Sequence, residues 1–118
     1  MAKATEAQKR EFIAKVQHAL ATLPMAYFRN KLKNAITIGD LGLTYKNIKG
    51  YVRDLTCEEY DDGPNIDYDH PQEDFYWVFI ITIQHKKIYI RLKVREKSDG
   101  KVYVASFHYD DRTHDWGF

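Results

Sequence analysis

Apolar side chains recur at helical spacing in two stretches of the N-terminal half. The first follows a capping box at residues 5–8 and runs to Leu23, where a proline interrupts it. The second follows Thr44, a residue type that commonly caps a helix, and its apolar stripe reaches Leu55. The pattern predicts two helices, and it leaves residues 25–38 open between a helix, a strand and an extended arm.

The C-terminal half carries the pattern of a sheet. Residues 75–84 are aromatic and β-branched with little polar alternation, which is typical of a central strand buried on both faces. Residues 87–95 then alternate strictly, with aliphatic side chains on one face and Lys, Arg and Tyr on the other. A hairpin turn at 98–100 leads to a third strand over 101–108. The acidic segment 58–74, with its Gly and Pro residues, indicates a surface loop.

Helices followed by strands indicate an α+β fold, with N-terminal helices packed on an antiparallel β-meander. The length predicts a single domain over residues 1–118. The longest apolar run is about seven residues, far below the roughly 20 that a membrane-spanning helix needs. The first residues lack the apolar core of a signal peptide, and the lone Cys57 excludes an internal disulfide. We therefore expect a cytoplasmic protein that makes no membrane contact.

The net charge of +1 conceals blocks of opposite sign. Residues 51–76 contain nine acidic residues and one Arg, whereas residues 77–101 contain seven Lys or Arg and two acids. The near-neutral total argues against non-specific binding of nucleic acid over the whole surface. The total is compatible with a local basic patch, because phosphates are attracted over about a Debye length, roughly 10 Å.

The polar face of the strand over residues 87–95 is the strongest candidate for function. It carries Lys87, Tyr89, Arg91, Lys93 and Arg95. Side chains on one strand face lie about 6.5–7 Å apart, close to the spacing of successive phosphates in an extended nucleic acid. The alternative is an amphipathic strand whose outer face only needs to be soluble.

His108 ends the last predicted strand, on the face expected of the even-numbered residues from Val102. Because neighbouring antiparallel strands share their faces, we expect His108 to lie near Tyr89 or Arg91. These groups can cleave RNA without a metal ion. One removes the 2′-hydroxyl proton, another protonates the leaving 5′-oxygen, and the guanidinium stabilises the phosphate charge. The alternative is that His108 only caps or packs the strand end.

Two groups of residues offer oxygen and imidazole ligands. They are Asp67, Asp69 and His70, and His108, Asp110, Asp111 and His114. Neither matches the spacing of a known metal site, so we predict no metal and no cofactor. The sequence also lacks the motifs of phosphate-binding loops, dinucleotide-binding folds and serine hydrolases.

Several short motifs occur in a fixed order between Leu41 and His108. They are Leu41-Gly42-Leu43-Thr44, Glu59-Tyr60, Gly63-Pro64, Trp77-Val78-Phe79, Tyr89-Ile90-Arg91-Leu92 and Ser106-Phe107-His108. In this order they resemble the MqsR-like RNA interferase toxins of the wider RelE-like fold.

The resemblance implies an endoribonuclease toxin that cuts mRNA without the ribosome or a metal cofactor and is silenced by a cognate antitoxin protein. It implies catalytic roles for Tyr89, Arg91 and His108, the last of which stands where the best-known branch carries a catalytic Lys. The RNA-binding residues of this hypothesis are Lys87, Lys93, Tyr60 and Trp77. For Trp77 a position in the core is favoured, and base stacking is the alternative.

Two positions depart from the family pattern. Asp61 stands in place of a Lys and Val78 in place of a Gln, and both departures bear on sequence specificity and catalysis. A different class of function is also compatible with the sequence. The chain would then be a non-catalytic binding module, such as a small phage or plasmid protein, that docks a partner through the basic strand or the acidic loop and leaves RNA intact.

Overall fold

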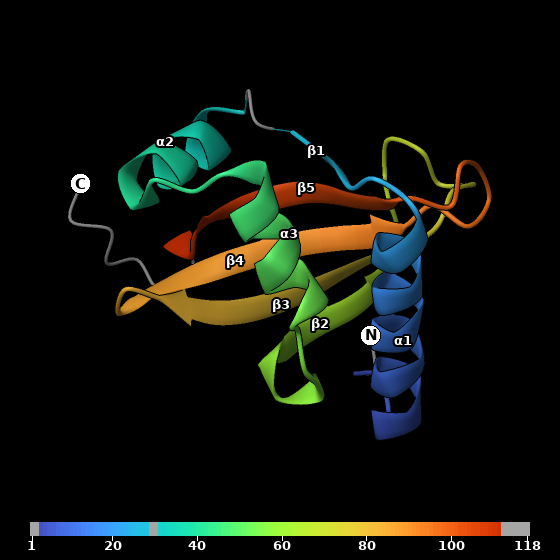
Figure 1. The fold of residues 1–118 in the computed structure, drawn as a ribbon. Coiled ribbons are helices and arrows are strands. Elements are labelled where there is room, and N and C mark those ends of the chain that lie inside the picture. Colours follow the sequence, from blue (N-terminus) through green and yellow to red (C-terminus); the bar gives the residue numbers. More distant parts are fainter. Residues whose placement is uncertain (1–2, 29–30, 112–118) are drawn as a thin grey trace.

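The computed structural model describes residues 3–28 and 31–111 and combines three α-helices with a five-stranded sheet (Figure 1). The helices are α1 (Glu6–Thr22), α2 (Leu32–Leu41) and α3 (Tyr45–Arg53), with a short 3₁₀ turn at Cys57–Glu59. The strands are β1 (Ala26–Tyr27), β2 (Tyr60–Asn65), β3 (Tyr76–Ile83), β4 (Lys86–Val94) and β5 (Val102–Tyr109). Their order is β1-β5-β4-β3-β2. The α+β class is confirmed, although β1 pairs parallel to β5 and makes the sheet mixed.

Helix α1 begins at the predicted capping box. The Gln8 N–H donates to Thr5 Oγ1 at 3.1 Å, and the Thr5 N–H donates to Gln8 Oε1 at 2.9 Å. The side chains buried by this helix, at helical spacing, are Phe12, Val16, Ala19 and Leu20. The apolar periodicity therefore identified the face that α1 turns to the core.

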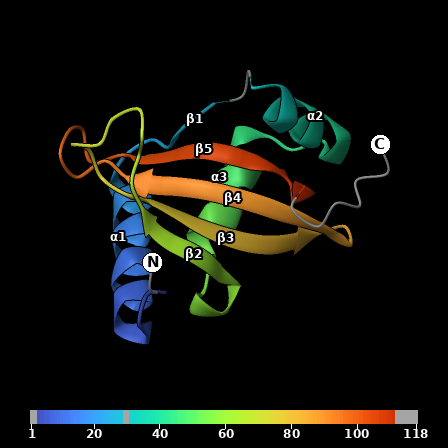
Figure 2. The same cartoon turned by 180° about the vertical axis from the view of Figure 1, so that it is seen from behind.

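Helix α3 begins in the same way, with Thr44 and Asn47 as the reciprocal pair. Its Ile48 and Val52 are fully buried. Both α1 and α3 lie on one face of the sheet, which is the near side in Figure 1 and the far side in Figure 2. The core forms between these helices and the sheet.

The segment over residues 25–38, which the sequence left open, contains both kinds of element. Residues 26–27 form β1, and α2 begins at Leu32. Helix α2 lies along the edge of β5, where the Asn34 amide and the Thr37 hydroxyl bond to backbone groups of the strand. These two side chains extend the hydrogen bonding of that edge beyond the short β1.

The pairing of β4 with β5 contains a bulge. Arg91 pairs with Ser106, but the next residue, Leu92, pairs with Val104, so Ala105 is the extra residue. As a result Val104 faces the helices, whereas Ser106 and His108 face the other side. The expectation that His108 shares a face with Val102 was wrong, because simple alternation fails at a bulge.

The acidic segment is only partly a loop. Residues 60–65 form the edge strand β2, which pairs with β3 through register shifts, and residues 66–75 form the loop. Strand formation there is supported by Tyr60, whose ring packs edge-on against Trp77 and Phe79. Gly63 permits the close approach, since a Cβ atom there would lie 2.9 Å from Trp77 Cα.

Strand β3 is buried less evenly than its composition suggests. Phe79, Ile81 and Ile83 lie in the core under the helices, but Thr82 on the opposite face is exposed and Ile80 is half-buried. None of the helices in the described part of the chain has the length and apolar character needed to cross a membrane.

Candidate functional site

The face of the sheet turned away from α1 and α3 is the near side in Figure 2. The strand register places most of the candidate residues on this face. We call it the outer face. Its side chains, assigned from the strand register, are Tyr76, Val78, Ile80 and Thr82 of β3, Lys87, Tyr89, Arg91 and Lys93 of β4, and Tyr103, Ser106 and His108 of β5. The 66–75 loop closes over one end of this face.

Tyr89 and His108 are direct partners across β4 and β5. Their rings are stacked, with centroids 5.2 Å apart and planes 11° from parallel. Both side chains are half-buried. The prediction that His108 lies near Tyr89 is therefore confirmed, and the bulge at Ala105 produces this arrangement because it turns His108 to the outer face.

The tautomer of His108 follows from its backbone contact. Its Nδ1 lies 2.9 Å from the carbonyl oxygen of Tyr109, and a carbonyl can only accept a hydrogen bond. Nδ1 therefore carries the proton in the neutral ring, and Nε2 holds the basic lone pair. Nε2 is the nitrogen that can accept a proton from a substrate.

Arg91 lies two residues along β4 from Tyr89, on the same face. Its guanidinium carbon lies 3.8 Å from the centroid of the Tyr76 ring, in cation–π geometry. Among the described residues it forms no ion pair with a carboxylate. A half-buried guanidinium in this state can receive the charge of a phosphate.

Lys87 continues the row on the other side of Tyr89. It is exposed and lies opposite Thr82 in the register with β3. Lys87, Tyr89 and Arg91 therefore follow one another along the outer face at the spacing of successive phosphates, about 6.5–7 Å.

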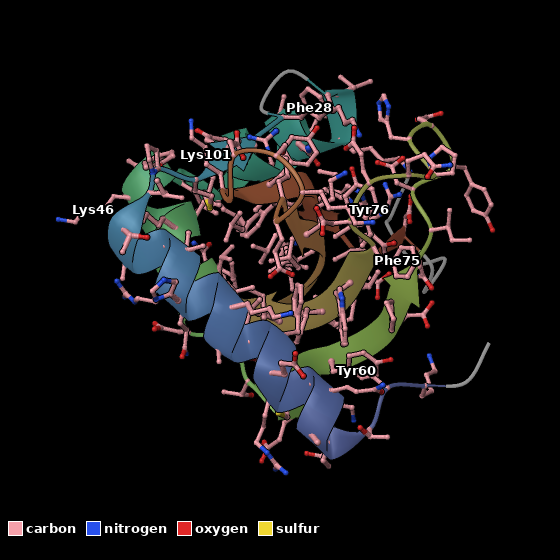
Figure 3. All side chains as sticks on the ribbon, turned by 90° about the vertical axis from the view of Figure 1, so that its right-hand side faces the viewer. Phe28, Lys46, Tyr60, Phe75, Tyr76 and Lys101 are labelled. Carbon is pink, nitrogen blue, oxygen red and sulfur yellow. The ribbon has the colours of Figure 1, made fainter. Side chains whose placement is uncertain are left out.

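Tyr60 and Trp77 lie on the opposite side of the sheet from Tyr89 and His108. Trp77 stacks on Phe12 of α1 at 4.5 Å, and Tyr60 lies beside α1, whereas Tyr76 points toward the 66–75 loop (Figure 3). The Tyr60 hydroxyl donates to the Gly63 carbonyl at 2.6 Å and accepts from the Ala4 N–H at 3.0 Å. Both rings therefore contribute to the packing of α1 and β2 and do not join the outer-face site.

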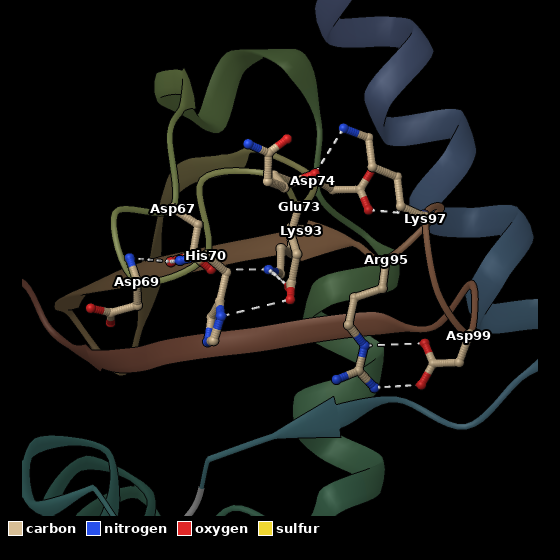
Figure 4. A network of polar contacts seen from close by, with 10 residues as sticks. Asp67, Asp69, His70, Glu73, Asp74, Lys93, Arg95, Lys97 and Asp99 are labelled. Carbon is tan, nitrogen blue, oxygen red and sulfur yellow. Dashed lines mark hydrogen bonds and ion pairs between the residues drawn. The ribbon is translucent and has the colours of Figure 1, made fainter.

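Lys93 lies on the outer face but is only 2% exposed. Its ammonium contacts Asp67 at 3.1 Å and Glu73 at 2.9 Å, which fastens the 66–75 loop to β4 (Figure 4). Sequence alternation predicted its face correctly but could not show that a distant loop covers it. In this structure its charge is neutralised within the chain and is not presented to a phosphate.

The surroundings shift the pKa values of this buried pair. Burial raises the pKa of Asp67, but the Lys93 ammonium and the backbone N–H groups of Asp69 and His70 outweigh burial and lower it overall. Burial lowers the pKa of Lys93, but its bonds to Glu73 and Asp67 outweigh that effect and raise it. Both groups are therefore charged across the neutral range.

Sequence reasoning missed a polar cleft of about 570 Å³ beside Arg91. The 66–75 loop forms one wall, and Phe28 and Lys31 form the other. Its lining residues are Phe28, Lys31, Asp67, Asp69, His70, Glu73, Tyr76, Arg91, Lys93, Arg95, Tyr103 and Ala105. We call it the side cleft. The sequence did contain one indication of this contact. Residues 51–76 are acidic and residues 77–101 are basic, so the 66–75 loop and β4 carry opposite charges and attract each other.

Two phenols contribute to the floor of the side cleft. Burial raises the pKa of Tyr103 to about 12, and Tyr76 adds to this shift. Burial also raises the pKa of Tyr76. Both side chains therefore face the cleft as neutral hydroxyl groups at physiological pH.

Within the described residues, no three His, Cys, Asp or Glu side chains are grouped so that they could hold a metal ion. Asp67 instead accepts hydrogen bonds from Lys93 and from the backbone N–H groups of Asp69 and His70. His114, from the second group considered in the sequence, lies outside the described residues.

Comparison of the chain with models of known protein families, with curated proteins and with solved structures finds no match in any of the three. The resemblance of residues 41–108 to MqsR-like toxins therefore stays a hypothesis based on short motifs.

Proposed function

We propose that this protein is a metal-independent endoribonuclease that cuts single-stranded mRNA on the outer face of its sheet. The observation that carries the proposal is the stacked pair of Tyr89 and His108, with Arg91 beside it on the same face. The order of motifs shared with MqsR-like toxins supports the same reaction.

The proposed reaction needs only side chains of this chain. Nε2 of His108 removes the proton of a ribose 2′-hydroxyl, whose oxygen attacks the adjacent phosphorus. The bond from phosphorus to the 5′-oxygen breaks, and the Tyr89 hydroxyl gives that oxygen its proton. Arg91 stabilises the charge on the non-bridging oxygens. The products are a 2′,3′-cyclic phosphate and a free 5′-hydroxyl, and the His108 proton returns to Tyr89 to restore both groups.

The resemblance extends the proposal to the biological setting. The substrate would be cytoplasmic mRNA outside the ribosome, and a cognate antitoxin protein would bind the chain and silence it. Lys87, exposed at one end of the row, would contact the backbone of the RNA.

The test is incubation of the purified protein with a long single-stranded RNA in excess EDTA, beside His108→Ala and Tyr89→Phe. Matched controls are His18→Ala and Tyr51→Phe, because both residues are exposed on helices away from the outer face. We expect cleavage by the wild type and the controls, and at least a tenfold loss in the two site variants. The 5′ ends of the products should carry hydroxyl groups, and a 2′-deoxy substitution at the cut should block cleavage.

Unchanged cleavage by His108→Ala and Tyr89→Phe would show that these residues are not catalytic, although the protein would still be a ribonuclease. RNA that stays intact with folded wild-type protein would overturn the proposal and favour the non-catalytic binding module.

A further inference from the structure

The side cleft lies next to the proposed site of cleavage. Arg91 belongs to both sites, since it lies two residues from Tyr89 on β4 and lines the cleft. Two residues along a strand span about 6.5–7 Å, which is one phosphate spacing. The cleft volume of about 570 Å³ lies within the roughly 300–1,000 Å³ typical of small-ligand sites.

The cations that remain available in the cleft are Arg91 and Lys31. Lys93 is paired with Asp67 and Glu73, and Arg95 forms a two-bond contact with Asp99 at 2.8 and 3.1 Å. Arg91 and Lys31 contact aromatic rings and have no carboxylate partner among the described residues. They are therefore the groups that would hold a phosphate.

An aromatic ring stands at the same wall as Lys31. Phe28 is 43% exposed and meets Tyr103 edge-on, with ring centroids 5.1 Å apart. An exposed phenyl ring next to cations is the arrangement on which single-stranded nucleic acids stack their bases.

The opposite wall carries three acidic side chains, Asp67, Asp69 and Glu73, beside His70. The Asp69 carboxylate is exposed and has no cationic partner within the described part of the chain, because Lys93 is taken by Asp67 and Glu73. A carboxylate repels phosphate but accepts hydrogen bonds from the amino groups of adenine, cytosine and guanine. Uracil has no amino group to offer.

We propose that the side cleft binds one nucleotide of single-stranded RNA and favours a base that carries an amino group. The phosphate of this nucleotide lies on Arg91 and Lys31, its base stacks on Phe28, and Asp69 accepts from the amino group. The proposal rests on the proposed ribonuclease function, because it places this nucleotide next to the bond that is cut.

The test measures binding without cleavage. Labelled 2′-O-methyl oligonucleotides of A, C or U lack the reactive 2′-hydroxyl, and their Kd is measured by fluorescence anisotropy. We expect A and C to bind at least fivefold more tightly than U. Phe28→Ala should weaken binding of A and C at least fivefold, and Asp69→Asn should reduce their advantage over U. Phe75→Ala is the matched control, since Phe75 is 46% exposed but lines a different pocket against α1.

Equal Kd values for the three oligonucleotides, or wild-type affinity in Phe28→Ala and Asp69→Asn, would overturn the proposal. The two proposals can fail separately. If the protein cleaves RNA but Phe28→Ala and Asp69→Asn do not change binding, the proposed role of the side cleft is wrong and the ribonuclease proposal stands. If binding is selective and depends on Phe28 and Asp69 but RNA stays intact, the side cleft binds RNA as proposed and the proposed cleavage by Tyr89 and His108 is wrong.

Discussion

The Asn34 side chain makes the hydrogen bonds to the backbone around Phe107 that a neighbouring strand would otherwise make. Its Oδ1 accepts the Phe107 N–H at 3.0 Å, and its Nδ2 donates to the Ala105 carbonyl at 3.2 Å and to the Phe28 carbonyl at 2.7 Å. Asn34 is 2% exposed, so these backbone groups lie away from water. The amide therefore stabilises the bulge that turns His108 toward Tyr89.

Replacing this amide should destabilise the fold. We expect Asn34→Leu to lower the free energy of unfolding by about 3 kcal/mol, because it leaves buried backbone groups without partners. Urea denaturation measures the change. Asn47→Ala is the control, since Asn47 is an exposed capping amide of α3 and its loss should cost about 1 kcal/mol or less. Equal losses in the two variants would contradict the role assigned to Asn34.

Removing one partner of the buried ion pair should be costly, and removing both should not. We expect Lys93→Met to lower the free energy of unfolding by about 3–5 kcal/mol, because it leaves the Asp67 carboxylate buried and unpaired. The double variant Lys93→Met/Asp67→Leu should recover most of this loss. A double variant as unstable as the single one would show that the pair itself stabilises the loop.

The same pair should shape the dependence of stability on pH. Because the pKa of Asp67 is lower in the folded chain, its contribution is complete above about pH 4, the range of an unfolded Asp, and falls as pH drops through the folded pKa. The raised pKa of Lys93 preserves its contribution until pH rises above about 10.4 and through the folded value.

Urea titrations between pH 6 and pH 2 should therefore show a steeper loss of stability in the wild type than in Lys93→Met/Asp67→Leu. Other acids with lowered pKa values, Asp62, Asp99 and Asp111, are present in both chains, so the difference reports on Asp67 and the other contact of Lys93, Glu73. Parallel curves would contradict the assignment.

Two glycines should respond in opposite directions to the same substitution. Gly63 has a φ of +119°, and a Cβ atom there would lie 2.9 Å from both Trp77 Cα and the Tyr76 carbonyl oxygen. We expect Gly63→Ala to destabilise the protein by more than about 1 kcal/mol. Gly39 lies inside α2 with nothing within 4 Å of the added atom, so Gly39→Ala should stabilise by up to about 1 kcal/mol. Thermal unfolding of both variants provides the comparison.

Local chemistry explains which parts of the fold could be predicted. The capping boxes at Thr5 and Thr44 and the stripes behind them identified α1 and α3, because those signals lie within a few neighbouring residues. The alternation in β4 was also readable from the sequence. The hairpin anticipated that the end of β5 lies beside Tyr89, but the face of His108 depends on the bulge at Ala105.

The remaining features depend on contacts between distant segments. The bulge at Ala105 is supported by Asn34, which is 71 residues away in sequence, so alternation could not reveal it. Lys93 looked solvent-exposed because Asp67 and Glu73 belong to a loop 20 or more residues earlier. The side cleft combines Phe28 with Tyr103 and Arg91, and no local pattern brings these residues together.

Helix α2 covers the edge of β5, and this affects how another protein can bind the chain. A bare strand edge exposes N–H and C=O groups onto which another chain can add a strand, and this is a common route to aggregation. Beyond β1, the edge of β5 is occupied by Asn34 and Thr37. At the opposite edge, register shifts on both sides of Asp62 interrupt the ladder between β2 and β3. Both edges are thus poor templates for strand addition, so we expect a protein partner to bind through side chains of the helices or the outer face.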